Sequence, residues 1–157
     1  KCAQITRTCC QQREIFVTVG DQARITRYTG LSGFWEYRAP TDPDYVDQDH
    51  DPNWLRWVFR PDGTRPILRR AENGDCSFLT PAGCQLPVEI RPIVCRLYPF
   101  AYTEAGLTGI DSACPPEVIP PGSHLLQVLD MRLADAQRWH AMLYHELRTR
   151  TPYDAET

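Results

Sequence analysis

The stretch SHLLQVLDMRLADAQRWHAMLYHELRTR (residues 123–150) holds the clearest structural pattern in the chain. It contains neither Gly nor Pro, and its apolar residues recur at steps of three and four. This spacing places the apolar side chains along one face of an α-helix. The pattern therefore predicts a long amphipathic C-terminal helix over residues 123–149.

One strand and two short helices are predicted near the N-terminus. The β-branched and aromatic residues of EIFVT (14–18) favour a strand. Asp21 is a suitable N-cap for a helix over residues 21–29, and Gly30 suits the left-handed position that ends it. Ser32 is a suitable N-cap for a second short helix that follows directly.

The middle of the chain alternates between loops and short elements. Residues 39–53 carry five aspartates and three prolines, which predicts a solvated acidic loop. Residues 55–70 are expected to form a β-hairpin around the PDG turn, and a short helix is expected to begin near Pro92. The fold class is therefore α+β: a small antiparallel sheet with several short helices and a long C-terminal amphipathic helix, built around a cysteine metal site.

The composition indicates one domain and excludes several classes of protein. The 157 residues fit a single cysteine-cluster metal-binding domain, 1–157, with its motif region over 2–114. The net charge of −3 and the lack of a basic cluster argue against nucleic acid as a partner. No apolar run approaches the roughly 20 residues that span a bilayer, which argues against a membrane partner. Because no signal-peptide pattern is visible, we expect a cytoplasmic protein whose thiols stay reduced.

Seven cysteines stand out in a chain of this size. An odd number leaves one thiol over in a fully disulfide-bonded protein, so metal or redox chemistry is the favoured use. Thiolates bind zinc and iron–sulfur clusters, and seven exceed the four that one tetrahedral ion needs. A multinuclear cluster, two separate sites, or some thiols that are not ligands would each account for the excess. The candidate metal ligands are Cys2, Cys9, Cys10, Cys76, Cys84, Cys95 and Cys114.

The adjacent pair Cys9 and Cys10 and the arginines around Cys95 refine this hypothesis. Neighbouring side chains of an extended chain point to opposite faces, so both thiols of the pair reach one ion only through a bend. Four thiolates on zinc or on an oxidised four-iron cluster carry net negative charge. Arg91 and Arg96 are candidate cofactor-binding residues, because their guanidinium groups would offset that charge and lower the pKa of the thiols. The alternative is that both arginines form ordinary surface ion pairs.

These residues resemble the YkgJ-type cysteine-cluster proteins, a family described as zinc- or iron-chelating and related to the flagellin lysine-N-methylase. The family pattern begins with C-x3-C-x2-C-C, continues through a D-x-x-R-I helix and ends in C-x-F-L…C…R-P-x-x-C-R-x-Y-P-F. Here CAQITRTCC (2–10), GDQARI (20–25) and the residues from 76 to 100 carry these motifs. Thr6 stands where the pattern has its second cysteine. A hydroxyl is a poor replacement for a thiolate on a soft metal.

The resemblance implies a thiolate centre that holds an iron–sulfur cluster, the favoured cofactor, or zinc. It also implies a role in modifying a protein or peptide partner, and it identifies no catalytic residue. Because Thr6 lacks a thiol, three alternatives remain: Cys114 or a water molecule completes the site, the centre is reduced or altered, or the site has degenerated. The competing hypothesis is a non-catalytic module in which zinc staples loops together.

Overall fold

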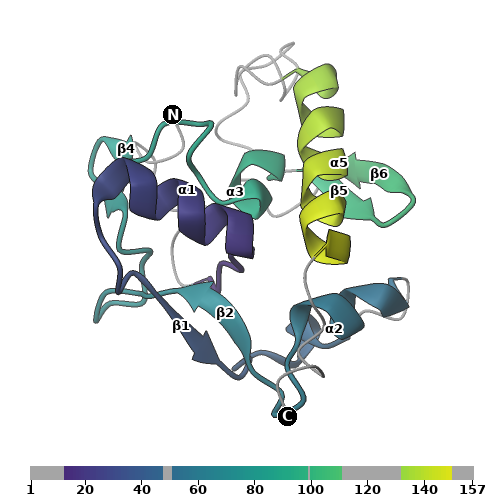
Figure 1. The fold of residues 1–157 in the computed structure, drawn as a ribbon, viewed down its shortest axis with the longest axis horizontal. Coiled ribbons are helices and arrows are strands. Elements are labelled where there is room, and N and C mark those ends of the chain that lie inside the picture. The colour runs from purple at the N-terminus through teal and green to yellow at the C-terminus, as the bar shows by residue number, and fades with distance from the viewer. Residues whose placement is uncertain (1–12, 48–50, 99, 111–131, 150–157) are drawn as a thin grey trace, which may run out of the picture.

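The computed structural model describes residues 13–47, 51–98, 100–110 and 132–149 (Figure 1). Within these ranges the fold is α+β, as predicted, and its strands pair into three separate two-stranded antiparallel sheets. None of the helices in these ranges has the length and apolar character needed to cross a membrane. The elements are α1 (Val19–Thr29), β1 (Trp35–Arg38), the 3-10 helix η2 (Pro43–Tyr45), α2 (Pro52–Val58), β2 (Arg65–Leu68), β3 (Leu79–Thr80), β4 (Gly83–Cys84), α3 (Ile93–Leu97), β5 (Phe100–Thr103), β6 (Gly106–Ile110) and α5 (Leu133–Thr149).

Helix α1 begins two residues earlier than predicted, because Thr18 and not Asp21 is its N-cap. The Thr18 hydroxyl accepts a hydrogen bond from the Asp21 N–H at 2.9 Å, and the Asp21 carboxylate accepts one from the Thr18 N–H at 3.0 Å. This reciprocal pair is a capping box. Gly30 ends the helix as expected, in a left-handed conformation with φ 74°.

Two local predictions are wrong, one because of strand pairing and the other because a helix begins at Pro52. The residues after Ser32 form strand β1 instead of a second helix, and Trp35 of β1 lies opposite Leu68 of β2. In the expected hairpin, the first arm is the helix α2, which begins at Pro52, a favourable first helical residue. Only the turn and the returning strand β2 are confirmed. The predicted strand at 14–18 is reduced to one bridge, from Phe16 to Ile67.

Helix α5 confirms the described part of the predicted C-terminal helix, whereas residues 123–131 lie outside the described ranges. Its buried face packs against α2, α3 and the β5–β6 hairpin, and it forms one apolar cluster with them. A second cluster surrounds Ile25 and Phe34 and includes Cys76. Helix α3 lies between α1 and α5 (Figure 1), and its Val94 contacts both clusters. The helix that carries Cys95 therefore lies at the centre of the packing.

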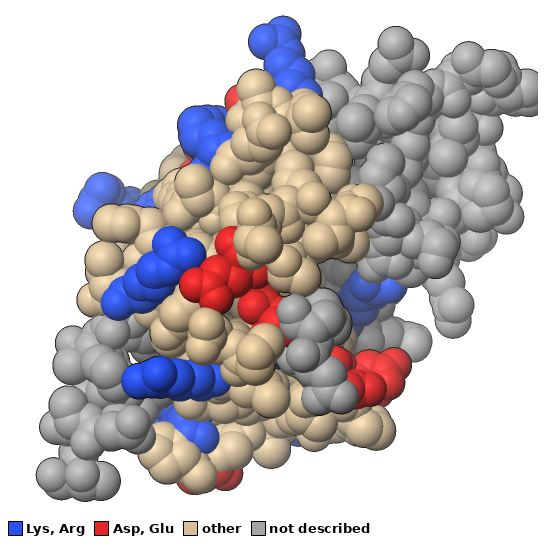
Figure 2. Space-filling model, turned by 90° about the vertical axis from the view of Figure 1, so that its right-hand side faces the viewer, with Lys and Arg blue, Asp and Glu red and all other residues tan. Residues whose placement is uncertain are grey.

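Charge on the surface is mixed. On the face shown in Figure 2, acidic and basic side chains lie interspersed among other residues. Several charged surface residues form ion pairs, such as Arg148 with Glu104 at 3.3 Å and Arg138 with Glu89 at 3.0 Å. Exposed pairs of this kind add little stability, so the apolar clusters dominate the energetics of the fold.

Candidate metal centre and adjoining pocket

Three of the predicted metal ligands meet at one small cavity. Cys76, Cys84 and Cys95 all line a space of about 60 Å³. They come from different parts of the fold: the turn before β3, the end of β4 and the middle of α3. Cys76 is buried, and the other two thiols are partly exposed. The rest of the wall consists of Leu68, Phe78, Leu86, Arg91 and Pro92.

The other candidate ligands, Cys2, Cys9, Cys10 and Cys114, lie outside the described residues, as does Thr6. In the part of the chain that is described, no three His, Cys, Asp or Glu side chains stand close enough together to hold a metal ion. Cys76, Cys84 and Cys95 thus share a cavity without completing a metal site on their own.

Short hydrogen-bonded turns bring Cys76 and Cys84 to this cavity. The Leu79 N–H donates to the Cys76 carbonyl at 3.0 Å, and the Thr80 hydroxyl donates to the Gly83 carbonyl at 2.7 Å. Gly83 has φ 115°, a conformation that a residue with a side chain rarely adopts. Strands β3 and β4 have two residues each, so they contribute little stability of their own.

Cys95 is positioned by a carboxylate from another helix. Asp21 of α1 is fully buried and accepts hydrogen bonds from the N–H of Ile93, the first residue of α3, at 3.2 and 3.3 Å. It therefore caps the helix that carries Cys95. Arg24 donates to Asp21 at 2.7 Å and to Glu146 of α5 at 2.6 Å. Burial raises the pKa of Asp21, whereas Arg24 and the Thr18 N–H lower it.

The two arginines beside Cys95 have different positions. Arg91 lines the cavity with the thiols, and its Nε donates to the Leu86 carbonyl at 2.8 Å. Arg96 is buried and donates to the carbonyls of Arg91 and Glu89 at 2.8 and 2.7 Å. Arg91 can therefore offset negative charge among the thiols, while Arg96 holds the loop that precedes α3.

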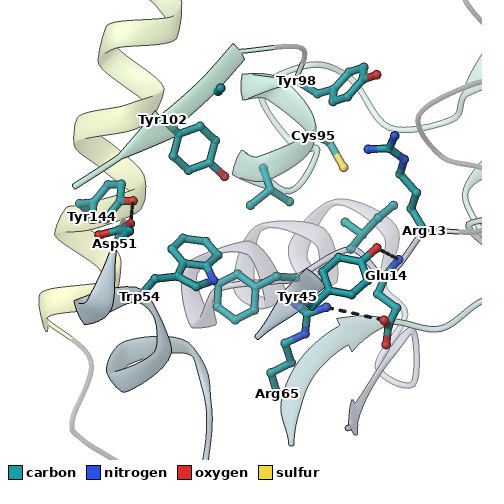
Figure 3. A pocket seen from close by; sticks show the side chains of 14 residues that line it. Arg13, Glu14, Tyr45, Asp51, Trp54, Arg65, Cys95, Tyr98, Tyr102 and Tyr144 are labelled. Atoms are coloured by element: carbon teal, nitrogen blue, oxygen red, sulfur yellow. Dashed lines mark hydrogen bonds and ion pairs between the residues drawn. The ribbon is translucent and has the colours of Figure 1, made fainter. Parts of the chain in front are cut away.

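A larger pocket of about 330 Å³ adjoins the cavity, and Cys95 lines both (Figure 3). Six of its fourteen lining residues are aromatic, and polar groups lie at its two ends. Asp51 lies at one end beside Tyr144, and Arg13, Glu14 and Arg65 lie toward the other. The aromatic members of the wall are Phe16, Tyr45, Trp54, Tyr98, Tyr102 and Tyr144.

Asp51 departs from the solvated acidic loop that its sequence predicted. It is only 4% exposed, and the Tyr144 hydroxyl donates to its Oδ2 at 2.7 Å. Burial, followed by this hydrogen bond, raises the pKa of Tyr144. Burial, followed by the charge on Cys95, raises the pKa of Tyr102. Both phenols are therefore neutral at pH 7, and the negative charge at this end comes from Asp51.

The opposite end holds a buried pair of charges, and some atoms of each lack a hydrogen-bond partner. Arg65 is 3% exposed and Glu14 is 7% exposed, with 3.9 Å between their nearest nitrogen and oxygen atoms. Among the described residues, Nε and Nη2 of Arg65 and Oε1 of Glu14 have no hydrogen-bond partner. The guanidinium group of Arg65 lies 4.4 Å from the centre of the Tyr45 ring. Burial lowers the pKa of Arg65.

The aromatic pocket was not predicted from the sequence. Its residues come from six separate segments, and Cys95 and Tyr98 are the two that also belong to the distal cysteine motif. The nearest signal is Asp51 three residues before Trp54, a pattern shared by many surface loops.

Comparison of the chain with models of known families, with curated proteins and with solved structures found no match in any of the three.

Proposed function

We propose that this protein is a cysteine-cluster metalloprotein that binds an iron–sulfur cluster through thiolates. The observation that carries the proposal is the convergence of Cys76, Cys84 and Cys95 on one cavity from three different elements. Buried cysteines also serve as small apolar residues, but three thiols on one cavity supply the donor atoms that a soft metal prefers.

The surroundings of the three thiols fit a soft metal centre. Sulfur is the donor that iron–sulfur clusters and zinc prefer. Leu68, Phe78 and Leu86 give the same space apolar walls, and Arg91 supplies a positive charge that favours thiolates over thiols. We expect the remaining ligands to come from Cys9 and Cys10 first, and then from Cys2 and Cys114.

An iron–sulfur centre supplies electron transfer or Lewis acidity when bound. From the resemblance to the YkgJ-type proteins, we propose that the centre supports modification of a protein or peptide partner. The residues described here would hold the centre and exclude water from it. Asp21 would hold Cys95 in place through the first turn of α3.

A second candidate is a zinc module without catalytic activity, and one observation favours it. The thiols lie on very short elements, since β3 and β4 have two residues each and α3 has five. Elements of this length need an external link, and a structural zinc ion supplies one in many small domains. In this case removal of the metal would unfold the region around the thiols.

Anaerobic purification followed by analysis of iron, acid-labile sulfide and zinc distinguishes the two candidates. An iron–sulfur protein is brown, with broad visible absorption and matching iron and sulfide contents. A zinc module is colourless and contains zinc in a fixed ratio. Cys95→Ser should reduce the metal content, whereas Ser77→Ala, an exposed control next to Cys76, should leave it unchanged. Wild-type protein that contains neither metal would refute the proposal.

A further inference from the structure

The aromatic pocket beside Cys95 is polarised along its length. Its Asp51 end carries one negative charge, because the neighbouring phenols are neutral. Its other end carries the guanidinium groups of Arg13 and Arg65 against the single carboxylate of Glu14. The described lining residues therefore give the pocket one negative and one positive end.

The Asp51 end has the features of a site for an organic cation. Trp54 lies 6.3 Å from both Tyr102 and Tyr144, measured between ring centres, and Tyr102 lies 6.4 Å from Tyr144. The three rings pack against one another at this spacing, and all three line the pocket beside the Asp51 carboxylate (Figure 3). Aromatic faces attract ammonium groups, and a buried carboxylate adds a charge-assisted hydrogen bond.

The opposite end of the pocket carries an excess of positive charge that can attract an anion. Arg65 is almost fully buried, yet its Nε and Nη2 have no hydrogen-bond partner among the described residues. These two nitrogens are enclosed by surrounding side chains, so Arg65 acts on the pocket through the positive charge of its guanidinium group. Arg13 lines the same end and lies near Cys95 in Figure 3. Glu14 is held by the N–H and hydroxyl of Thr41 and offsets only one of the two positive charges.

We propose that this pocket binds a small organic zwitterion with its two charges separated by a flexible chain. The ammonium group lies at Asp51 among Trp54, Tyr102 and Tyr144, and the carboxylate lies at Arg65 and Arg13. The volume of about 330 Å³ is at the lower end of ligand pockets, which suits a metabolite-sized molecule. Cys95 lines the middle of the pocket, so the probes below are tested on protein with and without bound metal.

Calorimetric titration of the wild-type protein with matched probes tests the proposal directly. The probes are 6-aminohexanoate, hexylamine, which lacks the carboxylate, and hexanoate, which lacks the ammonium group. We expect 6-aminohexanoate to bind about tenfold or more tightly than either analogue, since each charged end contributes a charge-assisted interaction. No binding of the zwitterion, or equal binding of one singly charged analogue, would overturn the proposal.

Variants then assign the two ends. Asp51→Asn should weaken 6-aminohexanoate and hexylamine and leave hexanoate unaffected, whereas Arg65→Gln should weaken 6-aminohexanoate and hexanoate. The exposed residues Asp62 and Arg38 provide matched controls as Asp62→Asn and Arg38→Gln, which should change nothing. If a buried variant fails to fold, Trp54→Leu tests the cation end through its aromatic wall. Equal losses for all three probes in Asp51→Asn would overturn the assignment of the ends.

Discussion

Replacing Asp21 by alanine tests whether this buried carboxylate organises the helix that carries Cys95. In the native protein it accepts hydrogen bonds from the N–H groups of Thr18 and Ile93 and from Arg24. Thr18 is 2% exposed and Ile93 is fully buried, so water cannot readily replace the lost acceptor. The variant therefore leaves two buried backbone donors unpaired.

The size of the effect follows from these contacts. Each unpaired buried donor costs about 1–3 kcal/mol, which gives about 2–6 kcal/mol for two. Arg24 keeps Glu146 as a partner at 2.6 Å, so its charge stays compensated. Burial raises the pKa of Asp21, so desolvation of the ionised carboxylate offsets part of its contribution. We expect Asp21→Ala to lower the free energy of unfolding by about 3–4 kcal/mol, a large part of the total for a domain of this size.

Denaturation in guanidinium chloride, followed by the fluorescence of the four tryptophans, measures this change. Wild type and variant are compared in excess chelator, so that release of metal contributes equally to both. Glu72→Ala, on an exposed residue, is the control and should shift stability by less than about 0.5 kcal/mol. A loss below about 1 kcal/mol for Asp21→Ala would refute the capping role. In protein that still folds, a lower metal content would show that Cys95 has moved.

Three further predictions concern Gly20, the buried tyrosines and Arg91. Gly20→Ala should destabilise the fold by about 1–3 kcal/mol, because the new methyl group would push the Glu146 carboxylate away from Thr18 and Arg24; unchanged thermal unfolding would contradict this. The pKa of Tyr102 and that of Tyr144 are raised in the folded state, so stability should be full below pH 10, the pKa of unfolded tyrosine. It should fall as the pH rises further, and ultraviolet titration should show both phenols ionising only when the protein unfolds. Arg91→Gln should speed the loss of metal to a chelator, since it removes positive charge from the thiol cavity; an unchanged rate would show that this guanidinium is not needed.

The helices could be predicted from the sequence where a local signal stands alone. α1 has a capping box and a closing glycine, and the described part of α5 has an uninterrupted apolar face. The residues after Ser32 have a helical spacing too, but their partner in β2 lies 30 residues away and decides their conformation. The β5–β6 hairpin was not predicted at all, because its pairing through Gly106 has only a weak turn signal in the sequence.

The candidate site was predictable to the extent that its residues are chemically unusual. Cysteine is rare enough to identify Cys76, Cys84 and Cys95 as a set, although not the distances between them. Tyrosine, tryptophan and arginine occur throughout the chain, so nothing in the sequence indicates which of them enclose a pocket. The sequence did not predict that Asp21 caps helix α3, because its hydrogen bond to Ile93 joins residues 72 positions apart.

Cys95 lines both the thiol cavity and the aromatic pocket. An alkylating reagent that enters from the aromatic side would have to displace whatever occupies that side before it reached this atom. A metal ion held on the other side would engage the same lone pairs and slow the same reaction. The rate at which Cys95 is alkylated therefore depends on what is bound in the cavity and on what is bound in the pocket. A molecule bound on one side can alter the reactivity of the thiol toward the other side.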